Sequence, residues 1–309
     1  MTTSPASGAL HRFAVFTAAC TFLLLVAGAL VTSNDAGLAV PDWPLSYGSL
    51  APPMVGGIKY EHGHRLLAAF VGLLTIILTL WLWRSEPRPW VRRLGLLALS
   101  AIIAQGVLGG LTVLFFLPVA ISVAHACLAQ VFFSTAVGLT LFTSRWWQRD
   151  LSQVEDSGAP RLRSLIVWTV AAVFLQLLLG AAFRHKGFGI APHLIGAAVV
   201  TFLIFWTARA LRRRFSAVPA LVRCRRLLHA LIGVQLLLGG AAWWSRWFAR
   251  GFPQPIPAMV WLTVAHTVVG ALTLAAAVVT ALVSFRVLNS GREEVMASRV
   301  QKMNELAAL

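Results

Sequence analysis

The sequence predicts an all-α, polytopic membrane protein whose eight transmembrane helices form two pseudo-symmetric four-helix bundles. Of 309 residues, 58% are hydrophobic and only 12% are charged. Apolar runs close to the length of about 20 residues that crosses a bilayer recur along the chain, and every second run carries a histidine near its start. We expect an N-terminal bundle within residues 1–150 and a C-terminal bundle within residues 151–309.

Hydropathy and flanking charge define the expected helices. They cover residues 12–32, 61–82, 94–116, 122–144, 164–183, 191–211, 227–245 and 260–285. An even number of spans places both termini on the same side of the membrane. The first run follows His11 and Arg12 and is longer than the apolar stretch of a cleavable signal, so we expect it to remain as a helix.

The formal net charge of +16 would suggest a nucleic-acid partner in a soluble protein, but its distribution argues against one. Most arginines fall in the termini and in every second loop. Few basic residues belong to the opposite face: Lys59, Arg65, Arg184, Lys186, Arg246 and Arg250. The positive-inside rule therefore places both termini in the cytoplasm. No transit peptide precedes the first run, which favours the plasma (inner) membrane of a prokaryote.

Four histidines suggest the chemistry. His64, His125, His193 and His266 each lie a few residues inside the start of alternate apolar runs, and so at one depth near the outer face. An imidazole in the membrane is costly unless it is functional, so we interpret the four as axial ligands of two haems. Zinc would need a tighter cluster with further ligands. No C-x-x-C-H motif is present, so the haems would be held noncovalently.

The remaining histidines and the cysteines receive no ligand role. Three of these histidines are expected near helix ends or in loops: His11, His185 and His229. His62 is either a loop-edge residue or a donor beside the first ligand. The three cysteines are expected to be unpaired, with Cys224 in a basic cytoplasmic loop.

The chain resembles a duplication of a four-helix unit. The run Gln105–Gly110 resembles Gln235–Gly240, and Gln176–Gly180 is a partial copy. Glycines fall on the odd runs and histidines on the even runs, which predicts one bis-histidine site in each half. The alternative is that these small residues merely let helices approach closely.

A carboxylate distinguishes the two halves. Glu61 lies three residues before His64, so both share one helix face. The corresponding position before His193 is Ile190. This predicts that only the first half is equipped for chemistry and that the second serves electron transfer. The alternative is an interfacial ion pair of Glu61 with Arg65 or Lys59.

These motifs resemble the haem A synthase family. The residues that carry the resemblance are Gly28–Val31, Gly37-Leu38, Pro41–Leu45, Glu61-x-x-His64-Arg65 and the single histidines of the fourth, sixth and eighth helices. It implies oxidation of the C8 methyl group of haem O to a formyl group by successive hydroxylations, giving haem A for cytochrome oxidase. It also implies that His64 and His125 bind the substrate haem, that His193 and His266 bind a permanent haem b, and that Glu61 is catalytic.

The outer segment between the first two helices departs from this pattern. Many bacterial members carry a cysteine pair there, but Ser33–Lys59 contains no cysteine, so no mechanism that uses such a pair can operate. Its prolines and aromatic residues suggest a lid over the substrate site or an interfacial aromatic belt. Arg65, adjacent to a ligand, is the candidate partner of a substrate haem propionate.

The expected partners are haem O, a haem O synthase, cytochrome oxidase assembly factors, a quinone or another electron acceptor, the lipid bilayer and a second copy of the chain. Two other functions use the same ligands. A dihaem b-type electron-transfer cytochrome linked to quinol would hold two permanent haems, and a haem-handling transporter would need no redox chemistry. Glu61, replaced by Ile190 in the second half, favours the enzyme.

Overall fold

The computed structural model describes residues 8–289 and confirms an all-α membrane protein with eight helices long and apolar enough to span a bilayer. These helices are α1 (Gly8–Ser33), α2 (Ile58–Ser85), α3 (Pro89–Leu114), α4 (Val119–Thr143), α6 (Leu162–Arg184), α7 (Ala191–Arg214), α8 (Pro219–Phe248) and α9 (Pro257–Val287). The protein is therefore a multi-pass membrane protein.

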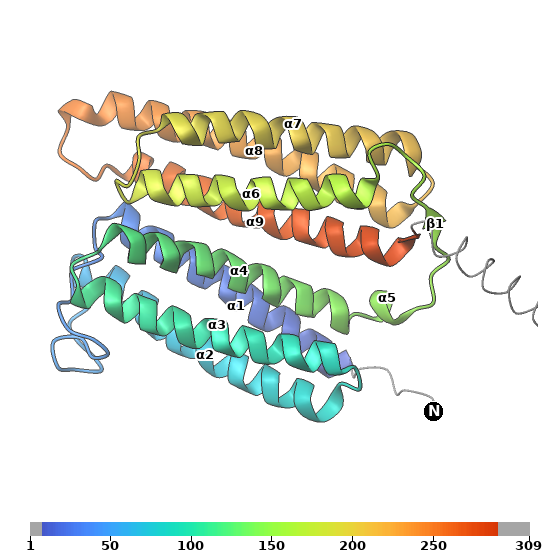
Figure 1. Ribbon diagram of the computed structural model, residues 1–309. Coiled ribbons are helices and arrows are strands. Elements are labelled where there is room, and N and C mark those ends of the chain that lie inside the picture. The colour runs from blue at the N-terminus through green and yellow to red at the C-terminus, as the bar shows by residue number, and fades with distance from the viewer. Residues whose placement is uncertain (1–7, 290–309) are drawn as a thin grey trace, which may run out of the picture.

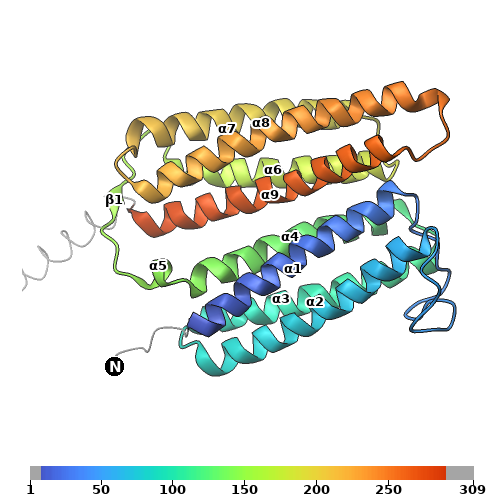
Figure 2. The same ribbon diagram turned by 180° about the vertical axis from the view of Figure 1, so that it is seen from behind.

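The helices pack as two groups of four (Figures 1 and 2). In the first group each of α1 to α4 contacts the next and α4 contacts α1; α6 to α9 contact one another in the same cyclic way. Helix α9 also packs against α1 and α4 and so joins the groups. Val260, Val264 and Val268 of α9 pack on Ala29 of α1 at this junction. The division of the chain at residue 150 into two domains stays a prediction.

Short elements lie between or after the membrane helices. They are α5 (Arg145–Gln148), β1 (Val154–Glu155), the 3-10 turn η1 (Ala249–Gly251) and β2 (Leu288–Asn289). Strands β1 and β2 pair in parallel, which attaches the linker before α6 to the end of α9. The buried carboxylate of Asp156 accepts hydrogen bonds from the backbone N–H groups of Leu162 and Arg163, at 2.9 and 3.0 Å, and so caps the start of α6.

One helix boundary was predicted wrongly. Helix α8 begins at Pro219 rather than at residue 227, whereas the other boundaries agree within five residues. Cys224 therefore lies buried in a helix and not in a loop, although all three cysteines are free as expected. The predicted start was too late because the arginines near the beginning of α8 were assigned to a loop. Long basic side chains at a helix end can reach the headgroups while the helix continues.

Alternation of helix direction brings the functional residues to one end. The start of α1 and the end of α9 lie at the same end of the molecule (Figure 1). The outer segment, residues 34–57, lies at the opposite end, where α2, α4, α7 and α9 begin. The four histidines lie within the first three turns of these helices, so the outer segment and the histidines share this end.

Candidate functional site

Each of the four histidine rings packs against a glycine of the preceding membrane helix. The pairs are Gly28 with His64, Gly109 with His125, Gly180 with His193 and Gly239 with His266. A Cβ atom on these glycines would lie 3.1, 3.3, 2.9 and 2.9 Å from the Cε1 atom of the respective ring. Such close approach leaves little or no room for a side chain. The glycines therefore make room for the imidazoles as well as for the neighbouring helix.

The rings of the two histidines of the second group lie close to each other and nearly perpendicular. The ring centroids of His193 and His266 are 6.2 Å apart, with an interplanar angle of 83°. Two imidazoles joined through one metal atom have centroids about 6 Å apart, because each metal–nitrogen bond is about 2 Å long. Their separation thus fits two axial ligands of one iron atom. Within residues 8–289, His64 and His125 make no comparable ring contact.

The donor set fits haem better than a tetrahedral metal ion. The Nδ1 atoms of His64, His125 and His266 are buried and have no hydrogen-bond partner in the described part of the chain. A buried imidazole that the protein leaves without a hydrogen-bond partner on Nδ1 calls for an explanation, such as a ligand bound by the same ring. Among the same residues there is no group of three or more His, Cys, Asp or Glu side chains that could hold a metal ion. A porphyrin brings its own four nitrogen ligands and needs only axial histidines.

Glu61 is buried in the first turn of α2, with 4% of its surface exposed. Its Oε1 atom accepts a hydrogen bond from Arg65 Nη2 at 2.6 Å, and Oε2 accepts one from the backbone N–H of Val40 at 2.8 Å. An ion pair with Arg65 was one of the two alternatives for Glu61, and it is present. The carboxylate is thereby fixed between α2 and the outer segment, and Ile190 precedes α7 in the corresponding place.

The outer segment is attached to α2 by the neighbours of Glu61. Arg65 Nη1 donates to the carbonyl groups of Asp42 and Leu45, at 2.7 and 2.6 Å. His62 is buried, and its Nδ1 atom lies 2.8 Å from Ser46 Oγ. His62 thus holds the outer segment, whereas Arg65 binds backbone carbonyls and Glu61. Its assignment to a haem propionate stays a prediction.

The outer segment is also held by hydrogen bonds within itself and by a contact with α3. The Asp42 carboxylate accepts hydrogen bonds from the N–H groups of Gly48 and Tyr47, which lower the pKa of Asp42, the Gly48 bond most strongly. The Trp43 ring lies on Gly110, where an added Cβ would be 2.8 Å away. Gly110 follows Gly109, the glycine that meets His125, so Trp43 packs on α3 one residue after that contact. This contact favours the lid interpretation over the aromatic belt.

Arg184, at the end of α6, joins the two groups of helices near their histidines. Its Nη2 atom donates to the carbonyl of Ala29 at 3.1 Å and to Ser33 Oγ at 2.6 Å, both on α1. Its Nη1 atom donates to Thr267 Oγ1 on α9 at 3.1 Å. Ala29 follows the glycine that meets His64, and Thr267 follows His266. Burial, and then the charge of Arg184, lower the pKa of the adjacent His185 to about 4, so its imidazole is neutral near pH 7.

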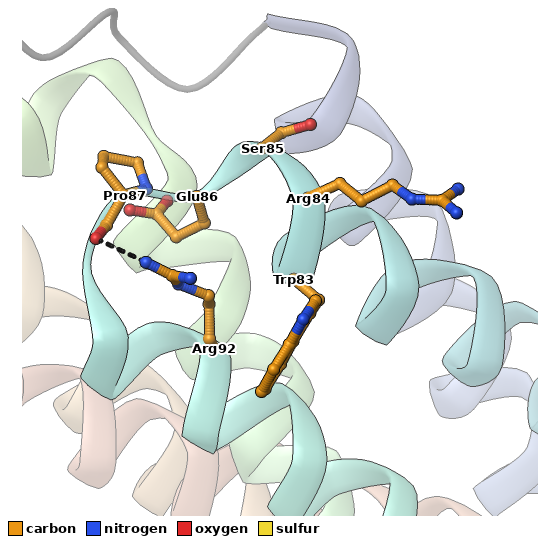
Figure 3. A pocket seen from close by; sticks show the side chains of 6 residues that line it. All are labelled: Trp83, Arg84, Ser85, Glu86, Pro87 and Arg92. Atoms are coloured by element: carbon orange, nitrogen blue, oxygen red, sulfur yellow. Dashed lines mark hydrogen bonds between the residues drawn. The ribbon is translucent and has the colours of Figure 1, made fainter.

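A pocket at the other end of the molecule is not part of this site. It lies at the turn from α2 to α3 (Figure 3) and is lined by Trp83, Arg84, Ser85, Glu86, Pro87 and Arg92. Arg92 Nη2 donates to the Pro87 carbonyl at 3.1 Å, and Glu86 pairs with Arg88 at 2.6 Å. None of the candidate site residues lines this pocket.

Comparison with known proteins shows which family part of the chain is similar to. The profile of the COX15-CtaA family, described as cytochrome oxidase assembly protein, matches residues 58–191. Over this segment the chain is similar to the COX15-CtaA family. The matched segment contains Glu61, His64 and His125 and ends just before His193.

Proteins similar to the chain include three bacterial proteins named heme A synthase. The chain is 27% identical over 237 residues to that of Symbiobacterium thermophilum, a match that covers 67% of this chain and 78% of the relative. It is 35% identical over 136 residues to that of Shouchella clausii, with 42% and 44% covered. It is 30% identical over 183 residues to that of Lysinibacillus sphaericus, with 57% and 58% covered. The last two matches thus span about half the length of each relative.

Several residues beside the histidines were not predicted from the sequence to be site residues. Gln176 and Gln235 were read only as part of a repeat, yet their amides lie beside His193 and His266. The signal was the constant spacing of four residues between glutamine and glycine. No pattern indicated that Arg184 would bridge two groups of helices, since that contact depends on how the groups pack.

Proposed function

We propose that the protein is a haem A synthase, which oxidises the C8 methyl group of haem O to a formyl group by successive hydroxylations. One observation carries the proposal. A buried carboxylate, Glu61, lies one turn before a glycine-backed histidine in the first group of helices, and Ile190 occupies the equivalent place in the second. Two similar ligand pairs, only one of which has a carboxylate beside it, suit a pair of haems of which one is modified. The names of the bacterial relatives support the same activity.

In this proposal the two histidine pairs have different tasks. His64 and His125 bind haem O as substrate, and His193 and His266 bind haem b as the permanent cofactor. Haem b, when bound, supplies one-electron transfer. The 6.2 Å separation of the His193 and His266 rings supports a ligand pair prepared for one iron atom. The first pair makes no such contact among residues 8–289, which suits a site that must admit and release its haem.

Glu61 is proposed to accept protons from the reacting carbon. Conversion of a methyl to a formyl group removes four protons and four electrons when the oxygen atom comes from water. A carboxylate on the same helix face as His64 is suitably placed for the protons. Its hydrogen bonds to Arg65 and to the Val40 N–H hold it in this position and close the outer segment over it. The electrons pass to a separate acceptor, such as a quinone.

The cellular setting follows from the charge distribution. We place the protein in a prokaryotic plasma membrane, with both termini in the cytoplasm and the histidine end facing outward. A haem O synthase would supply the substrate and cytochrome oxidase assembly factors would receive the product. A second copy of the chain remains a further proposed partner.

The test is expression together with a haem O synthase, followed by pigment analysis. Wild-type protein should yield haem A and its alcohol intermediate in addition to haem B. Glu61→Gln preserves the shape of the side chain and removes its ionisable group, so it should retain haem b and lower haem A production about 100-fold or more. Near-normal haem A production by this variant would defeat the catalytic role. Haem B alone from the wild type would favour the electron-transfer cytochrome instead.

Glu86→Gln provides the matched control. Glu86 is also buried, with 2% exposed, and pairs with Arg88 at 2.6 Å, but it lies at the opposite end of α2. Its replacement removes a buried carboxylate from an ion pair without touching the histidine end. Haem A production should therefore continue in Glu86→Gln. If both variants lost haem A equally, a general effect on folding would explain the loss.

A further inference from the structure

Three membrane helices carry a glutamine one helical turn before the glycine that meets a histidine. The pairs are Gln105 with Gly109, Gln176 with Gly180, and Gln235 with Gly239. On α1 the residue four positions before Gly28 is Leu24. Residues four apart lie on one helix face. Each glutamine therefore points toward the same histidine helix as its glycine, and α1 has an apolar side chain at this position.

The two glutamines of the second group contact the ligands. Gln176 Nε2 lies 3.0 Å from His193 Nδ1 and donates to the His193 carbonyl at 2.8 Å. Gln235 Nε2 lies 3.5 Å from His266 Nε2, a longer contact at the limit of hydrogen bonding. Gln176 is thus the better-placed of the two amides.

Glycines of the histidine helices make room for both amides. An added Cβ at Gly196, three residues after His193, would overlap Gln176 Oε1. An added Cβ at Gly270, four residues after His266, would lie 3.3 Å from Gln235 Nε2. Residues three and four apart share a helix face. The second group therefore contains a fitted place for an amide beside each ligand.

The first group lacks this support. The Gln105 Oε1 and His125 Nδ1 atoms are both buried and have no hydrogen-bond partner among residues 8–289. The side chain of Leu24, facing His64, has no polar group. Among the described residues, neither ligand of the first group is therefore held by the side-chain amide of a glutamine.

An imidazole that binds iron through Nε2 keeps its proton on Nδ1, and a partner on Nδ1 fixes the tautomer and the ring orientation. Gln176 Oε1 is buried and unpartnered in the described structure, so it is an unused acceptor. The two ends of an amide are alike in shape. Rotation of the Gln176 amide about its terminal bond would bring Oε1 to the Nδ1 proton of His193, in exchange for the hydrogen bond that Nε2 donates to the His193 carbonyl.

We propose that Gln176 is a positioning residue that fixes the His193 imidazole for haem b. This amide would make the second site retain its haem, whereas the first site, with Leu24 facing His64, releases its haem. This inference rests on the haem-binding part of the proposed function. It adds the reason why two similar histidine pairs would differ in haem exchange.

Gln176→Leu tests the inference by giving α6 the residue that α1 carries. Transfer of haem b from the purified full-length protein to apomyoglobin should become about 10- to 100-fold faster, the usual effect of losing a partner of a metal-ligating histidine. The low-spin electron paramagnetic resonance signal should also shift. Gln105→Leu, the matched change in the first group, should leave haem b transfer unchanged. Wild-type transfer rates in Gln176→Leu would overturn the inference.

Gln176→Glu keeps the inference testable if the leucine variant does not fold. The carboxylate is a stronger acceptor for the Nδ1 proton and makes the imidazole a better donor to ferric iron, so the midpoint potential of haem b should fall. A role in packing alone would leave the potential unchanged, and that result would overturn the inference. Haem A production is measured in the same membranes, so that the two proposals can fail separately. If the wild-type protein makes no haem A, the proposed synthase activity is contradicted. Faster haem b release from Gln176→Leu would still support the positioning role.

Discussion

The outer ends of the two groups of helices share a ligand pattern and differ in what surrounds it. In the first group the outer segment is fixed over His64 by Glu61, His62 and Arg65. The second group has short connections, and its two histidines lie in ring contact beside two glutamine amides. Four glycine-backed imidazoles can therefore serve both sites, while reactivity and haem exchange are set by the neighbouring side chains.

The largest expected effect comes from removing a ligand of the second group. His193→Ala or His266→Ala should abolish the low-spin haem b spectrum, because low-spin iron requires both imidazoles. The measurement is the absorption and electron paramagnetic resonance spectrum of purified protein. His229→Ala is the control, since that ring packs on Phe205 and its Nδ1 atom lies 3.0 Å from the Arg225 carbonyl. Unchanged spectra in both ligand variants would refute the assignment of haem b to this group.

A smaller effect is expected from releasing the outer segment of the first group. Arg65→Ala removes the donor to two carbonyls and leaves Glu61 buried without its cation, a change that costs about 3–5 kcal/mol for a fully buried pair and less here because Arg65 is partly exposed. Hydrogen exchange in residues 38–48 should accelerate and substrate affinity should fall. Arg250→Ala, which removes a cation stacked 3.9 Å over Trp247, should change neither. Unaltered exchange in Arg65→Ala would show that the segment is held by other contacts.

Transfer of the amide to the first group would sharpen the comparison. Leu24→Gln places a glutamine four residues before Gly28, as in the second group, and should slow release of the substrate haem by up to about 10-fold. The measurement is the rate of haem transfer from the first site to apomyoglobin. Leu23→Gln is the control because Leu23 is 54% exposed on the outside of the bundle. Equal rates in the two variants would mean that exchange is governed elsewhere, for example by the outer segment.

The smallest expected effect concerns acid stability at the junction of the groups. The pKa of His185 is about 4 in the folded protein, against an ordinary value of 6.5, because of burial and the charge of Arg184. The unfolded chain then binds more protons between these values, so the stability that neutral His185 contributes is lost as the pH falls from about 6.5 to about 4. Thermal unfolding in detergent should show this slope, and His185→Gln should flatten it. The same slope in the variant would assign it to another group.

The sequence predicted the helices and the helix pairs, which depend on the periodicity of residues along the chain. It did not predict contacts that depend on how distant segments pack. The alternation of glycine and histidine runs indicated the helix pairs, and the structure confirms that Gly180 and His193 meet. The start of α8 was predicted too late because the arginines near its beginning are typical of a cytoplasmic loop. The contact of Trp43 with Gly110 joins segments far apart in sequence and required the fold. The same holds for Arg184, whose acceptors lie on helices before and after its own.

Arg184 makes the two groups mechanically dependent on each other. A displacement of α6 toward α9 would lengthen its hydrogen bonds to Ala29 and Ser33, and a displacement toward α1 would lengthen the bond to Thr267. Ala29 follows Gly28, the glycine that meets His64 of the first site, and Thr267 follows His266, a ligand of the second. A chain severed in the linker between the groups would keep all four histidines, yet the guanidinium would lose its anchorage whenever the halves parted. Arg184 therefore helps to set the distance between the two sites, because its one side chain is hydrogen-bonded to both groups of helices.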